Sequence, residues 1–253
     1  MTRNELHLDR ARAESFGPVA EDYDRYRPTF PDELIDDLVA GRPAAVLDVG
    51  CGTGKATVLL AKRGLDVLGV ELDERMAEIA RGHGIPVEVG AFETWDDGGR
   101  QFDLITFAQS WHWINPELGI PKVATLLRSG GVIARFWNFY VVDEPVRGAL
   151  DAVYREHVPE IHPHTQGPTD EDRTIADPFA ANDLFTAFEN KMYGLDVRLS
   201  ADHWVAMVST FSDHRQLAPD RLAVLQRESR ATIESFGGAV PARHAAFAQF
   251  ARR

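Results

Sequence analysis

Cysteine is almost absent from this 253-residue sequence, in which Cys51 stands alone. One cysteine excludes an internal disulfide and excludes a metal site built from several thiolates of one chain. Long apolar runs are also absent, because none reaches the roughly 20 residues that a membrane-spanning helix requires. The first residues contain no apolar stretch of the kind found in signal peptides. We therefore expect a cytoplasmic protein with no membrane partner.

Basic residues are scarce as well, with 27 lysines and arginines against 39 aspartates and glutamates and a formal net charge of -12. Such a surface repels phosphate backbones on average, so we expect no nucleic-acid partner. Apolar residues make up 44% of the chain. This length and composition can bury one large core, which predicts a single domain.

Short apolar runs alternate with helical stretches over the first half of the chain. Buried strands are predicted at residues 44–49, 67–72, 87–89, 102–107 and 132–137. Helices are predicted from about Pro31 to Gly41, over residues 55–63, from a cap at Asp73 to Gly82, and over residues 121–127. The repeated strand–helix order predicts a doubly wound α/β fold with a mostly parallel sheet and right-handed crossovers.

A glycine-rich turn follows the first predicted strand. Glycines at 50, 52 and 54 allow a tight turn and a close approach of a ligand to the main chain. A dinucleotide fingerprint would need a sixth-position glycine where Lys55 stands, which weakens a nicotinamide-dehydrogenase interpretation. Asp48, two residues before the first glycine, suits a ligand with an ammonium group. Glu71 ends the second strand, where a carboxylate can accept hydrogen bonds from both hydroxyls of a ribose.

Residues 47–54, Leu-Asp-Val-Gly-Cys-Gly-Thr-Gly, resemble the first motif of class I S-adenosylmethionine-dependent methyltransferases. The resemblance implies a seven-stranded Rossmann-like sheet and S-adenosylmethionine as the cofactor. It also implies three groups of cofactor contacts. These are Asp48, Gly50, Cys51 and Gly52 for the methionine part, Glu71 and Leu72 for the ribose and ring, and Ala91 and Phe92 beside the adenine. At Ala91 the sequence departs from the family, which commonly has aspartate there.

Two further segments resemble small-molecule methyltransferases related to the trans-aconitate type. In residues 16–28 the resemblance implies that Tyr23 and Arg27 close over the cofactor, with Arg27 paired to its methionine carboxylate. Residues 109–113, directly after the fourth strand, form the other segment. We expect Gln109 to contact the cofactor and Trp111 and Trp113 to form walls of the acceptor pocket, and a place in the core is the alternative for the two tryptophans.

His112 lies where a methyl acceptor would approach the sulfonium. An imidazole there could remove a proton from a hydroxyl, so His112 is the candidate catalytic base. A structural histidine held between two tryptophans is the alternative.

For the remaining residues that could have a chemical role, a structural role is the preferred interpretation. Cys51 is expected to be a small residue that fits the turn. The histidines at 157, 162 and 164, with Asp170 or Asp172 nearby, match no zinc-binding spacing, so no metal site is predicted. The segment from 203 to 214 is expected to form solvated helix ends, and the alternative, which the family resemblance implies, is a contribution to the pocket.

The domain therefore divides into a helical cap at residues 1–43, a cofactor-binding core at 44–138, a helical lid insertion at 139–185, and a C-terminal part at 186–253. The predicted function is methyl transfer to a small molecule, by O-methylation of a carboxylate or a hydroxyl. The alternative is a non-catalytic S-adenosylmethionine-binding module or partner subunit. The acceptor and the oligomeric state are left open.

Overall fold

The structure, a computed structural model, describes residues 3–168 and 177–253. Within them one sheet has the strand order β3-β2-β1-β4-β5-β7-β6. Strands β3, β2, β1, β4 and β5 pair in parallel, whereas β7 pairs antiparallel with β5 on one side and β6 on the other. The bounds are β1 Val46–Val49, β2 Val67–Glu71, β3 Val87–Val89, β4 Phe102–Ala108, β5 Leu127–Val142, β6 Thr186–Ser200 and β7 Ala239–Arg252. The predicted α/β Rossmann-like fold is confirmed.

The parallel half of the sheet is covered by short helices. These are α3 Asp32–Val39, α4 Thr57–Lys62, α5 Glu74–Gly82 and α6 Pro116–Leu126. All four residues of β1 are buried, because both faces of this central strand are covered. Two helix starts follow from capping, since the side chains of Asp73 and Asn115 accept hydrogen bonds from the first turns of α5 and α6.

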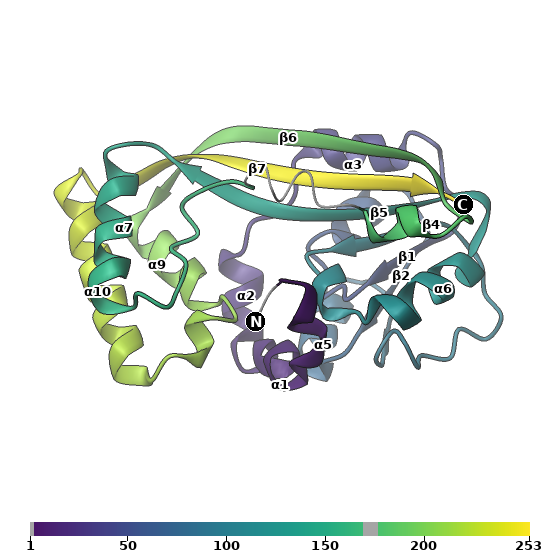
Figure 1. Ribbon diagram of the computed structural model, residues 1–253, viewed down its shortest axis with the longest axis horizontal. Helices are drawn as coiled ribbons and strands as arrows, with labels where there is room; N and C mark the ends of the chain where they lie inside the picture. The colour runs from purple at the N-terminus through teal and green to yellow at the C-terminus, as the bar shows by residue number, and fades with distance from the viewer. Residues whose placement is uncertain (1–2, 169–176) are drawn as a thin grey trace.

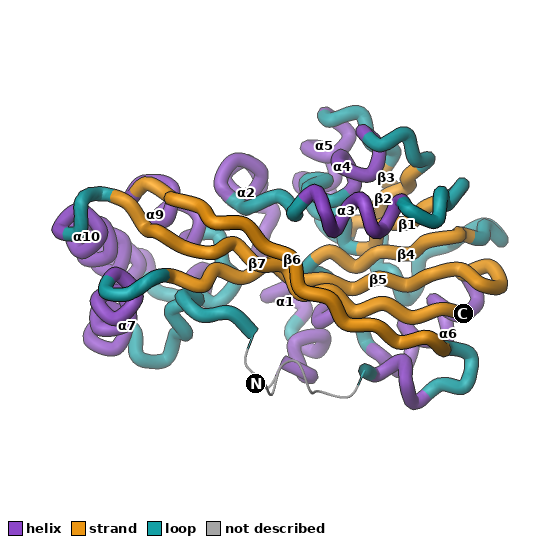
Figure 2. The backbone as a smooth tube through the Cα atoms, turned by 90° about the horizontal axis from the view of Figure 1, so that it is seen from above, coloured by secondary structure: helices purple, strands orange, loops and turns teal. Residues whose placement is uncertain are grey.

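Strands β5, β7 and β6 are much longer than the others and extend beyond the parallel half (Figures 1 and 2). Helices α7 Val146–His157, α9 Ala201–Ser209 and α10 Pro219–Ser235 lie at their far ends. Trp204 of α9 is fully buried there in an apolar cluster with Tyr140 and Val142 of β5. The long strands therefore connect two helix-covered halves of one molecule.

The N-terminal segment lies beside α5 and opposite the long strands in Figure 1. It consists of η1 Arg3–Leu8, α1 Arg10–Ala13, η2 Glu14–Val19 and α2 Ala20–Tyr26. Helix α2 contacts both α5 of the parallel half and α9 of the far half. Three further 3-10 turns complete the described elements, η3 Trp111–Trp113, η4 Pro178–Ala181 and η5 His214–Gln216.

Two predicted boundaries were wrong. Residues 139–142 do not open the insertion but continue β5 to Val142, because they pair with β7. The helix expected at residues 121–127 begins already at Pro116, where Asn115 caps it.

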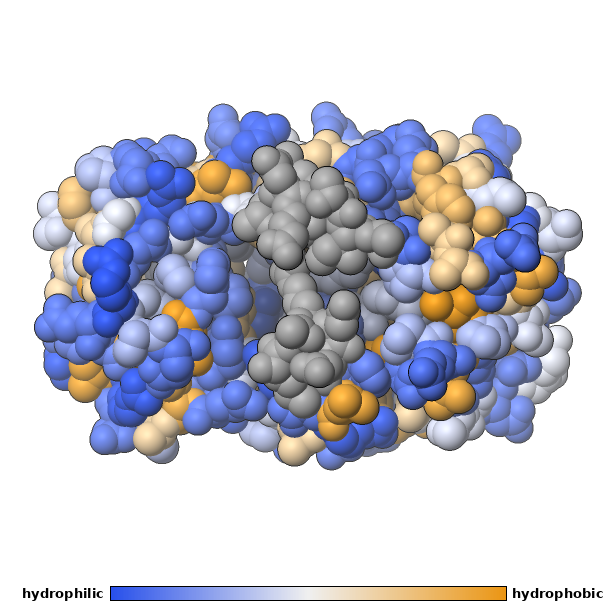
Figure 3. Space-filling view, in the orientation of Figure 1, coloured by the Kyte–Doolittle hydropathy of each residue, from blue (hydrophilic) through white to orange (hydrophobic). Residues whose placement is uncertain are grey.

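The described part contains no helix with both the length and the apolar character needed to cross a membrane. Hydrophilic residues dominate the face in Figure 3, and hydrophobic ones occur there in small groups.

Candidate functional site

The turn after β1 has the conformation that its glycines allow. Gly50, Gly52 and Gly54 have φ angles of 64°, 57° and 89°, in the left-handed region that side chains disfavour. At Gly50 a Cβ would also lie 2.5 Å from Cβ of Ser110, which follows β4. The turn therefore brings bare main chain to the carboxyl ends of the parallel strands, where doubly wound folds bind ligands.

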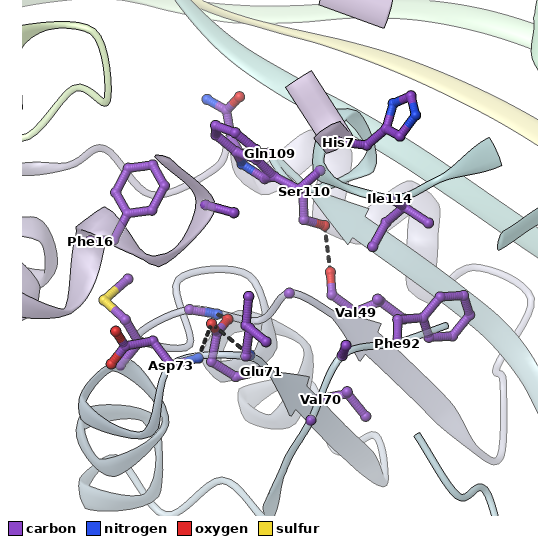
Figure 4. Close-up of a pocket in the computed structure, with 18 of the residues that line it drawn as sticks. His7, Phe16, Val49, Val70, Glu71, Asp73, Phe92, Gln109, Ser110 and Ile114 are labelled. Atoms are coloured by element: carbon purple, nitrogen blue, oxygen red, sulfur yellow. Dashed lines mark hydrogen bonds between the residues drawn. The ribbon is translucent and has the colours of Figure 1, made fainter. Parts of the chain in front are cut away.

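Glu71 at the end of β2 faces this turn (Figure 4). Its Oε2 accepts a hydrogen bond of 2.8 Å from the amide of Gly52, and its Oε1 accepts from the amides of Leu72 and Asp73. Burial raises the pKa of Glu71, and its backbone hydrogen bonds oppose this. A carboxylate offers about four acceptor positions, and three are used, so Oε2 can still accept from a ligand hydroxyl.

A first cavity of about 110 Å³ opens above Glu71. The predicted adenosine contacts Leu72, Ala91 and Phe92 all line it. The N-terminal segment contributes His7, Arg10, Ala13, Phe16 and Tyr23 to its lining, and Phe16 lies across from Glu71 in Figure 4. The remaining lining is mostly apolar and includes Val49, Val70, Met76, Trp113 and Ile114.

A second, smaller cavity of about 30 Å³ lies on the other side of the glycine turn. Gly50, Cys51 and Gly52 line it together with Arg27. The Arg27 guanidinium donates hydrogen bonds to Oγ1 and the carbonyl oxygen of Thr210, and burial lowers the pKa of Arg27. Among the described residues, no carboxylate lies within ion-pair distance of Arg27.

A third cavity of about 540 Å³ lies beyond Arg27 and η3. His112 and Trp113, the residues expected on the acceptor side, both line it. Its aromatic wall consists of Phe16, Tyr23, Trp113, Trp137, Phe139, Tyr140 and Phe211. Besides Tyr23 and Tyr140, the ionisable side chains that line it within the described part of the chain are those of Arg12, Arg27, His112, His162, His164 and Asp213.

Tyr23 and Gln109 each line all three cavities. Gln109 directly follows β4 and has a φ of 63°, while its amide donates a hydrogen bond to the carbonyl of Phe136 on β5. A non-glycine residue in this region carries strain of about 1–3 kcal/mol, and such residues concentrate at functional sites. The three cavities therefore converge on one point between α2 and the end of β4.

A buried polar cluster forms part of the wall of the third cavity. Nε2 of His164 lies 2.7 Å from Oδ2 of Asp213, and Nδ1 of His214 lies 2.8 Å from Oδ1 of the same carboxylate. The hydroxyl of Tyr154 on α7 is 2.8 Å from Nε2 of His214. His214 is fully buried, whereas His164 and Asp213 line the cavity.

Two predicted site residues lie elsewhere. Asp48 lines none of the three cavities, because it is fully buried and its carboxylate accepts hydrogen bonds from Thr57 at 2.6 Å and Thr106 at 2.7 Å. The expected contact between Asp48 and an ammonium group is therefore not supported. Trp111 also lines none of them, since it packs in the core between Phe107 and Phe179. The prediction that Trp111 is a pocket wall is wrong.

Cys51 fits its structural interpretation, being buried in a small apolar cluster beside α5. Burial raises the pKa of the Cys51 thiol, which opposes formation of a reactive thiolate. Asp170 and Asp172, named with the histidines above, lie outside the described residues.

Sequence reasoning missed several lining residues. For the segment from 203 to 214 the alternative holds over the solvated helix ends, because Phe211, Ser212 and Asp213 line the third cavity. The alternation of aromatic and polar residues in this segment was the available signal. Asn138 of β5 was also missed. It lines the second and third cavities, and its Oδ1 is buried without a hydrogen-bond partner.

Comparison with known proteins agrees with this geometry. Residues 46–131 match the family model described as a methyltransferase domain. They contain the glycine turn, Glu71, Gln109 and η3. This segment is a class I methyltransferase domain. Its class uses S-adenosylmethionine, so the predicted cofactor is confirmed.

Relatives of the chain carry the same general description. An uncharacterized methyltransferase of Mycobacterium tuberculosis is 39% identical over 127 residues, which cover 49% of this chain and 52% of that protein. The chain thus spans about half the length of its mycobacterial relatives. A Dictyostelium discoideum protein named as a methyltransferase is 29% identical over 209 residues, or 79% of this chain and 78% of that one.

The fold is shared with a solved structure from Anaeromyxobacter dehalogenans, described as a type II methyltransferase. The TM-score is 0.65 at 21% identity, with 90% of this chain and 98% of that chain covered. At this identity the likeness concerns the fold alone.

Proposed function

We propose that the protein transfers the methyl group of S-adenosylmethionine to an oxygen of a small-molecule acceptor, either a carboxylate or a hydroxyl. The observation that supports this most directly is the convergence of three cavities on Tyr23 and Gln109. Their lining suits the adenosine in the first cavity, the methionine tail in the second and the acceptor in the third. The sulfonium methyl would then lie at the point where the cavities meet.

The methionine tail has a candidate partner for its carboxylate. The Arg27 charge is enclosed by Tyr23 and Phe211, with Cζ 5.0 and 4.0 Å from the ring centroids. Since a buried cation is costly without a counter-ion, a ligand carboxylate beside Arg27 would stabilise it. For the tail's ammonium group, the partnerless Oδ1 of Asn138 is an available acceptor, because the Asn138 Nδ2 already donates to the carbonyl of Thr29.

The lining of the third cavity favours an anionic acceptor with a flat or apolar body. Among the described residues that line it, Arg12 and Arg27 carry positive charge into the cavity, and the one carboxylate, that of Asp213, is already hydrogen-bonded to two imidazoles. In displacement at the methyl carbon, an acceptor oxygen supplies an electron pair, the carbon–sulfur bond breaks, and its electrons remain on sulfur. Alignment of nucleophile, methyl and sulfur is the protein's main contribution, worth up to roughly 7–11 kcal/mol.

A carboxylate acceptor needs no base, whereas a hydroxyl acceptor must lose its proton. His112, on the wall of the third cavity, is the proposed base in that case.

The test is incubation of the full chain with S-adenosylmethionine labelled in its methyl group and with fractions of a bacterial metabolite extract. We expect cofactor binding by calorimetry, release of S-adenosylhomocysteine and a labelled product that base hydrolyses if it is an ester. Binding without turnover in any fraction would favour the non-catalytic module. Absence of binding to both cofactor forms would reject the proposal.

A further inference from the structure

The cluster of His164, Asp213 and His214 has no assigned role in the proposed methyl transfer. Two imidazoles and one carboxylate present one donor atom each, and these atoms lie within 4.8 Å of one another. Two histidines and one carboxylate are a recurring ligand set for first-row divalent metals. We propose that these three side chains form a binding site for a divalent transition-metal ion such as Zn²⁺.

The separations in the cluster are close to those around a shared cation. The distances from the Asp213 oxygens to the two ring nitrogens are 2.7 and 2.8 Å. Donor atoms of a tetrahedral Zn²⁺ site, each about 2.1 Å from the metal, are about 3.4 Å from each other. Binding of an ion therefore requires the two hydrogen bonds of Asp213 to open by about 0.6 Å.

The surroundings hold the ligands in place. The Asp213 Oδ1 also accepts a hydrogen bond from the His214 amide, which fixes the carboxylate. The Tyr154 hydroxyl lies beside Nε2 of His214, the usual position of a group that orients a metal-binding imidazole. On metal binding each neutral imidazole moves its proton to the other ring nitrogen, and the Nε2–H of His214 then donates to Tyr154.

The position of the cluster gives the site access to ligands. His164 is 39% exposed at its side chain and, with Asp213, lines the third cavity, whereas His214 and Tyr154 close the inner side. A three-ligand site of this kind leaves a coordination position open. That position would face the cavity and would accept an oxygen atom of a molecule bound there.

The experiment titrates ZnCl₂ into full-length protein that has been treated with a chelator, with binding followed by calorimetry. We expect one Zn²⁺ per chain with a micromolar or lower Kd, and visible absorption of a distorted tetrahedral site when Co²⁺ replaces Zn²⁺. His164→Ala and Asp213→Asn should abolish the one-to-one step and the Co²⁺ spectrum. Tyr154→Phe should weaken binding about 10- to 100-fold.

His162→Ala is the matched control, because His162 lines the same cavity and lies outside the cluster. It should bind Zn²⁺ as the wild type does. Thermal melting identifies any variant that fails to fold, and partly exposed His164 provides the variant least disturbing to the core. The absence of one-to-one binding in the wild type would overturn the proposal, as would unchanged binding in folded His164→Ala. S-adenosylmethionine titrated into the chelated protein tests the proposed function separately.

Discussion

The Glu71 carboxylate is hydrogen-bonded to the Gly52 amide, joining the end of β2 to the glycine turn after β1. The same carboxylate accepts two more backbone hydrogen bonds and forms part of the wall of the first cavity. The support of the turn and the predicted ribose contact thus depend on one side chain.

Glu71→Gln should weaken S-adenosylhomocysteine binding. The amide replaces one charged acceptor by a donor, and hydrogen bonds to charged groups contribute about 1.5–3 kcal/mol, or about 10- to 150-fold in Kd. Calorimetry measures the change. Glu74→Gln, three residues along the chain at the exposed start of α5, is the control and should bind normally. Equal affinities of the two variants would contradict the assignment of Glu71.

Arg27→Gln should weaken the binding of S-adenosylhomocysteine but not that of 5′-methylthioadenosine. S-adenosylhomocysteine carries the amino-acid carboxylate that Arg27 is proposed to hold, whereas 5′-methylthioadenosine has the nucleoside without it. The variant should therefore lose at least about 10-fold in affinity for the first ligand, the lower range for a charge-assisted hydrogen bond, and retain its affinity for the second. A parallel loss for both ligands would mean that Arg27 acts through folding of the N-terminal segment.

Gly50→Ala should destabilise the fold more than Gly64→Ala. Both glycines have positive φ, at 64° and 84°, so each alanine should cost about 1–2 kcal/mol in unfolding free energy. Only at position 50 does the new Cβ also collide with Ser110, because nothing lies within 4 Å at position 64. Urea unfolding of the two variants measures the difference, and equal losses would rule out the collision.

Gln109→Gly and Gln109→Ala separate backbone strain from side-chain contacts. Both remove the side chain, but only glycine relieves the positive φ, so the glycine variant should be more stable than the alanine variant by about 1 kcal/mol. Both should bind the cofactor more weakly than the wild type, because Gln109 lines all three cavities. Unfolding curves and calorimetry provide the two measurements.

Asp48→Asn should change the pH dependence of stability. Burial raises the pKa of Asp48 to about 6 from an ordinary value of 3.8, so the folded state holds this proton more tightly than the unfolded state. The stabilisation is fully present below pH 3.8 and is lost as the pH rises through about 6. The Asp48→Asn variant has no carboxyl group at this position that could ionise. Its unfolding free energy relative to the wild type should therefore increase across this interval, and a constant difference would contradict the raised pKa.

Local patterns predicted the parallel half of the molecule well. Strands such as Val67–Glu71 and Val87–Val89 are short apolar runs between turn residues, and Asp73 caps α5 as expected. The long strands β6 and β7 had no predicted bounds. β6 is mostly exposed, so it lacks a continuous apolar run, and it is fixed by pairing with β7, which is distant in sequence.

The site residues, too, could be predicted from the sequence only where they belong to a local motif. Glycines and Glu71 occur in a local motif, and the structure places them together. Asp48 and Trp111 have suitable positions in the sequence, but their side chains point into the core, where Thr57 and Phe179 contact them. Asp213 could not be placed by a local pattern, because the chain returns to the cavity only after the long strand β6.

The length of β5 has a consequence for altering the proposed specificity of the protein. This strand begins in the parallel half, contributes Asn138 to two cavities, and ends among the helices of the far half. Helices α7, α9 and α10 are attached to strand ends remote from the glycine turn. Directed evolution could therefore vary residues such as Phe211 to change which molecules are accepted, while the nucleoside pocket retains its shape.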